Sequence, residues 1–242
     1  MLDVVIFGAG GLGRMVCDTL AQAGVLRPVA FLDSAAAKHG RYVDGLPVHG
    51  GLEQWPTLRA KGLRHVIVAV GDNRDRVSLA TELKEAGAEL VSAIHPLATI
   101  APSAQLGEHL IVGARVTVCV HARIGPHCVL SPGSIIEHDN CLGTGVFLEP
   151  AVRLAGTVTA DDLVRVGIGA CVIPGRRLGA ACRVSPGAVV IRDVPPGATV
   201  TGVPAREAVR EGSRFVAEGA VVEGAVPDGA RLEAEALAAV AV

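Results

Sequence analysis

An aliphatic residue recurs at every sixth position through the second half of this 242-residue chain, and this period constrains the fold more than any other feature. Of the 16 positions at that spacing from residue 100 to residue 190, only Ala160 is not Ile, Leu or Val. The phase one residue later holds only two such residues, Ile173 and Ile191. The full series is Ile100, Leu106, Val112, Val118, Ile124, Leu130, Ile136, Leu142, Leu148, Leu154, Ala160, Val166, Val172, Leu178, Val184 and Val190.

A period of six fits neither an α-helix, which needs apolar spacing near 3.6, nor an isolated strand, which needs 2. It predicts short strands separated by corners, stacked into a prism in which each turn buries aliphatic side chains against the next. The residue two positions before each aliphatic is small or apolar in 14 of 16 hexads, and the exceptions are Asn140 and Arg176. The chain has one Trp, one Tyr and four Phe, which suits a narrow repetitive core better than a sandwich with a bulky centre.

The first half has the pattern of a parallel α/β sheet. Residues 2–8 read as a buried strand, followed at once by the glycine loop Gly8, Gly10, Gly11 and Gly13 and a helical stretch over 14–23. A second strand, 29–32, ends at Asp33, and a third, 65–70, leads into Asp72 and Asn73. This is the pattern of a Rossmann-like dinucleotide fingerprint, with an acidic residue for a ribose hydroxyl.

The glycine pattern alone leaves three interpretations open. The glycines permit close packing of a strand, a turn and a helix without any ligand. An NAD site would need a second nucleotide-binding half and a catalytic domain, and neither is visible before the repeat begins. The remaining interpretation is a half-site that holds one nucleotide or one phosphorylated group at a helix N-terminus.

Charge and cysteine content exclude several classes of partner. The net charge of −2 gives no basic surplus for nucleic acid or anionic lipid, and the N-terminal apolar run is too short for a signal peptide or a spanning helix. We therefore expect a cytoplasmic protein that binds neither nucleic acid nor membrane. The six cysteines show no CxxC pair or zinc-finger spacing, so we expect no metal site.

The hexads, such as residues 134–139 and 170–175, resemble those of the hexapeptide-repeat acyltransferases. Together with the glycine loop, FLDS at 31–34, AVGDNRDR at 69–76 and IHPLATIAPSA at 94–104, they closely resemble the bacterial sugar O-/N-acetyltransferases, which include sialic acid O-acetyltransferases and bacillosamine-type amino-sugar N-acetyltransferases. The resemblance covers residues 2 to about 206. It implies an α/β N-terminal Rossmann-like subdomain followed by a left-handed parallel β-helix of about five coils.

The resemblance also implies a separate role for each part of the chain. Residues 1–95 would hold the acceptor or its nucleotide, residues 96–206 would hold acetyl-CoA between the subunits of a homotrimer, and the role of residues 207–242 is unknown. The implied reaction is acetyl transfer from acetyl-CoA to an amino sugar, expected to be nucleotide-linked. N-transfer is favoured, O-transfer is an alternative, and neither the acceptor nor the acyl length is specified.

Acetyl transfer needs a base for the proton of the attacking acceptor and a hydrogen-bond donor for the thioester carbonyl. His138 breaks the apolar pattern together with Glu137, Asp139 and Asn140, and a functional site is where such a break is expected. The family's His-acid pair falls on His138 and Asp139, so His138 is the predicted general base and Asp139 its orienting partner. His109, His121 and His127, each three residues beyond an aliphatic, are interpreted as outward corner residues.

The remaining predicted site residues follow the family pattern. The backbone amides of Ala155 and Gly156 are candidates to bind the thioester carbonyl. The predicted substrate-binding residues are Gly8, Gly10, Gly11, Gly13, Asp33, Asp72, Asn73, Glu137 and Phe147, and the predicted coenzyme-binding residues are Ala155, Gly156, Gly167, Ile168 and Arg206.

Three positions depart from the family pattern. Phe147 stands where many relatives have a second active-site histidine, Leu12 replaces a histidine of the glycine loop, and Ser131 replaces an asparagine. These changes leave open an unusual amino sugar, an amine outside nucleotide-sugar metabolism, or a ligand-binding protein without catalysis. A zinc lyase on the same fold would need three converging histidines, and His121 and His127 have no properly placed third.

Overall fold

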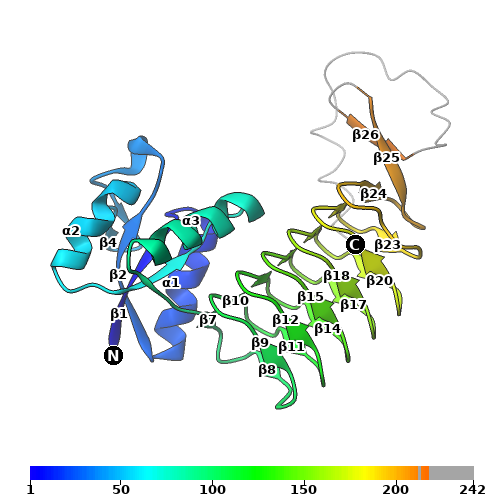
Figure 1. The fold of residues 1–242 in the computed structure, drawn as a ribbon, viewed down its shortest axis with the longest axis horizontal. Helices are drawn as coiled ribbons and strands as arrows, with labels where there is room; N and C mark the ends of the chain where they lie inside the picture. The colour runs from blue at the N-terminus through cyan, green and yellow to red at the C-terminus, as the bar shows by residue number, and fades with distance from the viewer. Residues whose placement is uncertain (212–213, 218–242) are drawn as a thin grey trace, which may run out of the picture.

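The computed structural model describes residues 1–211 and 214–217, which form an α/β part and a β-helix in contact with each other (Figure 1). The α/β part has a four-stranded parallel sheet in the order β2-β1-β5-β6, one strand more than the sequence predicts. The missed strand, β6, has only two residues, too few for a periodicity signal. The elements are β1 (Leu2–Phe7), α1 (Gly11–Ala23), β2 (Leu26–Leu32), η1 (Ala36–Lys38), β3 (Tyr42–Val43), β4 (Leu46–Pro47), η2 (Leu52–Gln54), α2 (Trp55–Ala60), β5 (His65–Val68), α3 (Asn73–Glu85) and β6 (Glu89–Leu90).

Helices cover both faces of this sheet. On one face α2 and α3 bury Trp55 and Leu83 against Phe7 of β1. On the other face α1 packs through Val16, and its first turn lies so close to β1 that a side chain at Gly13 would collide with the carbonyl of Gly8. A glycine is therefore required at position 13 for the packing of α1, whatever the loop binds.

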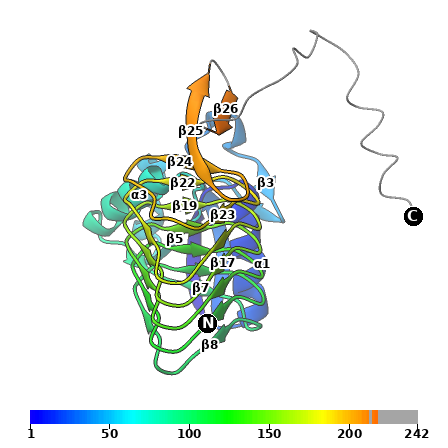
Figure 2. The same ribbon diagram turned by 90° about the vertical axis from the view of Figure 1, so that its right-hand side faces the viewer.

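The β-helix has three faces of stacked parallel strands (Figure 2). The first face contains β7 (Ala93–Ile94), β10 (Ile111–Val112), β13 (Val129–Leu130), β16 (Phe147–Leu148), β19 (Arg165–Val166), β22 (Arg183–Val184) and β24 (Thr199–Thr201). The second contains β8 (Thr99–Ile100), β11 (Thr117–Val118), β14 (Ile135–Ile136), β17 (Arg153–Leu154), β20 (Cys171–Val172) and β23 (Val189–Val190). The third contains β9 (Gln105–Leu106), β12 (Arg123–Ile124), β15 (Cys141–Leu142), β18 (Thr159–Ala160) and β21 (Arg177–Leu178).

The left-handed parallel β-helix is confirmed, but it has about six turns instead of five. The aliphatic residue of each hexad is the second residue of a strand and packs in the central core of the prism. Each fully buried side chain contributes about 1.5–3 kcal/mol. The additional turn arises because Ile94 already occupies a hexad position in β7 and because β24 continues the first face beyond the regular repeat. An antiparallel hairpin of β25 (Arg206–Glu211) and β26 (Arg214–Ala217) follows β24.

The corners use left-handed backbone at a regular position. The third residue after an inward aliphatic has positive φ through most of the prism, whether it is a glycine such as Gly145 or another residue such as Asp139. Positive φ is costly for residues with a side chain, although Asn, Asp and His tolerate it better than most. The predicted corner positions of His109, His121 and His127 are confirmed, with φ near 60° at each.

An apolar junction joins the two parts. The outward side chains of the first four strands of the first face, Ala93, Ile111, Val129 and Phe147, pack in one cluster with α1 and the sheet. On the next strands the outward residues are Arg165 and Arg183. The apolar docked portion of the first face therefore ends at Phe147, and the contacts beyond it are polar.

Arg76 and Asn73 of α3 connect the junction through hydrogen bonds. The fully buried Arg76 guanidinium donates to the carbonyls of His127 (2.9 Å) and Gly145 (2.9 Å) on two successive turns, and to Asn73 Oδ1 (3.0 Å). Burial lowers the pKa of Arg76 to about 10, so it remains charged at neutral pH. Asn73 Nδ2 donates to Leu163 O (2.9 Å) on the turn that follows.

His109 and His127 point outward from the prism, as predicted, but their side chains are not exposed to solvent. Both are buried where the α/β part covers the corner between the third and first faces. The Val68 N–H donates to His109 Nε2 (2.8 Å), so His109 carries its proton on Nδ1 and donates it to His127 Nδ1 (2.9 Å). The sequence gives no sign of this burial because it comes from docking between the two parts.

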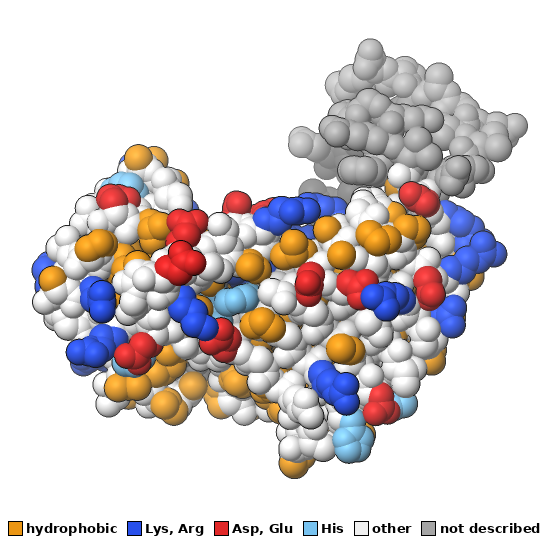
Figure 3. Space-filling view, in the orientation of Figure 1, with side chains coloured by type: hydrophobic (Ala, Val, Ile, Leu, Met, Phe, Trp, Pro, Cys, Tyr) orange, Lys and Arg blue, Asp and Glu red, His pale blue; other side chains and the backbone are white. Residues whose placement is uncertain are grey.

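The described residues contain no helix with the length and apolar character needed to cross a bilayer. Acidic and basic side chains are interspersed over most of the surface coloured in Figure 3, and several basic side chains gather at its right-hand end.

The histidine pair predicts acid-sensitive stability. Burial, together with the charges of His127 and Arg76, lowers the pKa of His109 to about 3 from 6.5, so below pH 6.5 the unfolded chain takes up a proton that the folded chain refuses. His109 therefore leaves the free energy of unfolding at its full value above pH 6.5. As the pH drops from 6.5 toward 3, the free energy of unfolding falls by up to about 1.4 kcal/mol per pH unit because of this residue.

Urea unfolding at a series of pH values below neutrality measures this slope. His109→Gln, which retains an acceptor for the Val68 N–H but cannot titrate, should show a shallower slope than the wild type. Glu108, Lys84 and Arg76, which act on the neighbouring His127, are unchanged in this control. Identical slopes in the two proteins would contradict the assignment.

Candidate active site

His138 lies at the corner between β14 and β15, beside Asp139, which has φ of 58°. His138 Nδ1 is 2.8 Å from Asp139 Oδ2, and both side chains are about half exposed. A carboxylate can only accept, so Nδ1 carries the proton and Nε2 has its lone pair free. The corner thus presents an oriented imidazole whose Nε2 can accept a proton.

Gly156 lies one turn further along the same edge, against the imidazole ring. A Cβ at position 156 would overlap the His138 ring, so only glycine leaves the ring in this place. The backbone N–H of Thr157 donates to His138 O (3.0 Å), which ties the two corners together.

Of the two backbone amides predicted to bind the thioester carbonyl, only one is free of a backbone hydrogen bond within the described residues. The Ala155 N–H donates to Val172 O (3.0 Å) in the ladder and is already used. Within the part of the chain that the structure describes, the Gly156 N–H has no acceptor. Gly156 is therefore the amide of this pair that is available to a ligand.

Asn140, the polar exception in the apolar series, holds these corners in place. It is completely buried, and its Nδ2 donates to Glu137 O (2.8 Å) and Ala155 O (3.1 Å). Its Oδ1 accepts the N–H of Val158 (2.7 Å). The interruption of the hexad pattern is thus a hydrogen-bonded bracket between the His138 corner and the Gly156 corner.

The predicted coenzyme residues fall on different edges. Gly167 and Ile168 lie at the corner between β19 and β20, whereas Ala155 and Gly156 lie between β17 and β18. The backbone amides of Gly167 and Ile168 are already occupied. Gly167 donates to Val184 O (2.8 Å) and Ile168 donates to Glu149 Oε2 (3.1 Å). Arg206 is exposed at the start of β25 and donates to Ala205 O. One chain therefore does not bring these residues around a single ligand.

The glycine loop opens into a cavity of about 510 Å³ at the carboxyl edge of the sheet. Gly8 and Gly10 line it with Asp33, as predicted for a nucleotide, whereas Gly11 and Gly13 do not. Asp33 accepts from the Ala9 N–H (2.8 Å) and from Lys38 Nζ (2.7 Å). Burial opposes its ionisation, but Lys38 and the two backbone N–H groups hold the pKa of Asp33 below its usual value.

Other predicted substrate residues have structural contacts. The Asp72 carboxylate caps α3 by accepting from the backbone of Arg74 and Asp75. Asn73 uses its amide in the junction, where Phe147 is also buried. Contact of these residues with a substrate stays a prediction, as does that of the half-buried Glu137.

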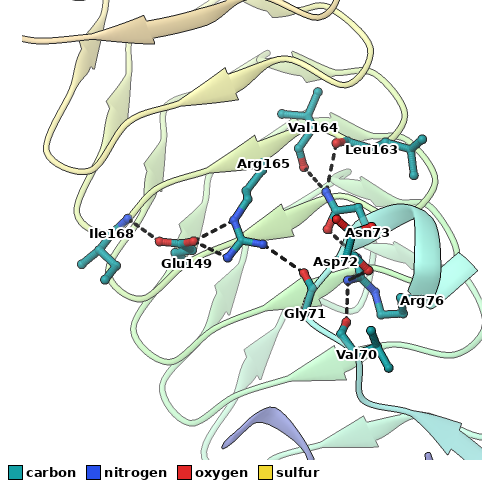
Figure 4. Close-up of polar contacts among 10 residues, drawn as sticks. All are labelled: Val70, Gly71, Asp72, Asn73, Arg76, Glu149, Leu163, Val164, Arg165 and Ile168. Atoms are coloured by element: carbon teal, nitrogen blue, oxygen red, sulfur yellow. Dashed lines mark hydrogen bonds and ion pairs between the residues drawn. The ribbon is translucent and has the colours of Figure 1, made fainter. Parts of the chain in front are cut away.

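The sequence reasoning missed an ion pair beside Phe147. Arg165 is held by Glu149 at 2.6 Å, donates to Gly71 O (2.9 Å), and places its guanidinium 4.6 Å from the centre of the Phe147 ring. Figure 4 shows Glu149 and Arg165 pointing toward one another between Ile168 and Gly71. No local pattern could reveal it, because the contacts join segments far apart in the sequence.

One chain does not bring together the two histidines considered for the zinc alternative. His121 lies at the corner between the second and third faces, and His127 at the corner between the third and first faces. Among the described residues there is no group of three or more His, Cys, Asp or Glu side chains that could hold a metal ion.

Comparisons with known proteins agree on the type of fold and chemistry. Residues 3–83 match the family model described as the PglD N-terminal domain. The chain is 31% identical over 216 residues to the GDP-perosamine N-acetyltransferase of Escherichia coli O157:H7, covering 85% of this chain and 96% of that protein.

Two solved structures cover the same region. One is perosamine N-acetyltransferase from Caulobacter crescentus with a histidine replaced by asparagine, in complex with CoA and GDP-perosamine (TM-score 0.83, 38% identity, 86% of this chain and 97% of that chain). The other is the acetyltransferase domain of PglB from Neisseria gonorrhoeae FA1090 in complex with acetyl coenzyme A (TM-score 0.78, 29% identity, 85% and 98%).

Replacing Asn140 with Ala is expected to lower the free energy of unfolding by about 1–3 kcal/mol, because it leaves buried backbone groups of two corners without partners. Urea denaturation measures the loss. Ser134→Ala is the matched control, since Ser134 is also fully buried but donates only to Ser131 O in its own corner. Equal losses in the two variants would argue against a bracket between corners.

Proposed function

Because this chain belongs to the hexapeptide-repeat sugar acetyltransferase family that includes the GDP-perosamine N-acetyltransferases, and is an acyltransferase, we propose that it acetylates the amine of a nucleotide-linked amino sugar. Acetyl-CoA is the donor and His138 the general base. CoA and acetyl-CoA in the structures of similar proteins support the choice of donor.

The observation that carries the proposal is the oriented His138–Asp139 pair. As the amine attacks the thioester carbonyl, His138 Nε2 takes its proton, and Asp139 stabilises the imidazolium that forms. The Gly156 N–H, beside the ring, is the available donor for the carbonyl oxygen. The C–S bond then breaks, and the CoA thiolate leaves and takes up a proton.

A homotrimer completes the site in this proposal. The edge with His138 and Gly156 differs from the edge with Gly167 and Ile168, so one ligand can reach both only where two subunits meet. Cyclic symmetry brings the one edge of a subunit to the other edge of its neighbour.

The cavity at Gly8, Gly10 and Asp33 supports a nucleotide on the acceptor. Leu12 cannot offer the hydrogen bond that a histidine of the glycine loop could make. The acceptor is therefore expected to differ from that of relatives with the histidine.

His138→Ala should reduce turnover by roughly 10²–10⁴-fold with the fold intact, measured as free thiol released from acetyl-CoA with a panel of free and nucleotide-linked amino sugars. His121→Ala is the matched control, because His121 is exposed on the same edge one turn earlier. Asp139→Asn should lower kcat less and change its pH profile.

Unchanged thiol release by His138→Ala would remove the proposed base. If calorimetry with the wild type shows no binding of acetyl-CoA, the alternative of a ligand-binding protein without catalysis is favoured instead.

A further inference from the structure

A second cavity, of about 300 Å³, opens where the N-terminal turn of α3 meets the β-helix beyond the apolar docked portion of the first face. It is lined by Arg74 of α3 and by the outward Arg165 and Arg183 of β19 and β22. Among the residues that the structure describes, Asp72 is the only acidic one in the lining.

The position of Arg165 in this cavity is fixed from three sides. Glu149 holds its Nε and Nη2, Gly71 O accepts from Nη1, and the Phe147 ring lies beneath the guanidinium (Figure 4). These contacts orient Arg165 as one wall of the cavity. Glu149 also balances its charge.

Arg74 and Arg183 add two positive charges to this cavity, against the carboxylate of Asp72, which Arg183 attracts. Both are exposed, and neither side chain has an ion-pair or hydrogen-bond partner within residues 1–211 and 214–217. The Asp72 carboxylate already accepts from the Arg74 and Asp75 N–H groups as the cap of α3. The cavity is therefore positive and suited to an anion.

The cavity at Asp33 has the opposite balance of charge. Asp33, Asp75 and Glu82 line it, and Lys38, the one cationic residue in the lining within the described part of the chain, is paired with Asp33 at 2.7 Å. Such a lining can hold a base and ribose hydroxyls but cannot neutralise a diphosphate. The two cavities flank the first turns of α3, since one contains Asp72 and Arg74 and the other Asp75 and Ser78.

We propose that the cavity of Arg74, Arg165 and Arg183 is the subsite for the diphosphate of the nucleotide-linked acceptor, with the nucleoside in the cavity at Asp33. This inference rests on the proposed function and adds the residues that bind the anionic part of the acceptor. Arg74 and Arg183 bind the phosphates directly, and Arg165 shapes the wall beside them. The same chemistry could serve the 3′-phosphate of CoA, which is the competing source.

The test compares nucleosides with their diphosphates by isothermal titration calorimetry on the full chain. GDP and UDP are titrated beside guanosine and uridine into the wild type, Arg74→Ala, Arg183→Ala and the control Arg64→Ala, which removes an exposed arginine outside both cavities. Each pocket variant should raise the Kd of the tighter diphosphate by about 10-fold and leave nucleoside binding unchanged. Arg64→Ala should behave as the wild type.

Diphosphate affinity that is unchanged in both pocket variants would overturn the proposal. CoA and 3′-dephospho-CoA form the second arm: if the variants weaken only CoA, the cavity binds the coenzyme phosphate and the proposal is wrong. Arginine-dependent diphosphate binding without acetyl transfer to any amino sugar would instead contradict the proposed function and leave this subsite standing.

Discussion

The structure depends on one repeated interaction, in which the backbone of each turn bonds to the turn above while an aliphatic side chain is buried in the column between them. A turn alone could not bury its apolar side chains, so stability comes from stacking. This constraint sets the height and direction of each outward side chain. His138 and Gly156 meet because they lie on one edge, one turn apart.

The core of the β-helix was predictable because its period is local and redundant. The hexad positions predicted its strands, inward residues and corners, and the error of one turn came from leaving Ile94 and β24 outside the series. The burial of His109, His127 and Arg76 was not predictable, because docking of the α/β part decides which outward side chains lose contact with water. A sequence period describes one face of a turn but not what covers it.

The candidate site was predictable to a similar degree. The polar break around His138 predicted a site at this corner, and the structure shows the hydrogen bond between His138 and the acid that follows it, whereas the catalytic role of both residues stays a prediction. The sequence could not separate Ala155 from Gly156, since the choice depends on which amide the ladder already uses. It also missed Arg165, whose partners Glu149, Gly71 and Phe147 come from three separate segments.

The buried guanidinium of Arg76 has a consequence for how an acceptor would be selected. It joins α3 to two successive turns of the prism, and Asn73 adds a third, so these hydrogen bonds resist movement of the α/β part against the β-helix. These contacts hold the distance from the cavity at Asp33 to the β-helix. Under the proposed function, an acceptor is selected by its length as well as by its chemical groups, because an acceptor amine set too near or too far along the molecule fails to reach the thioester.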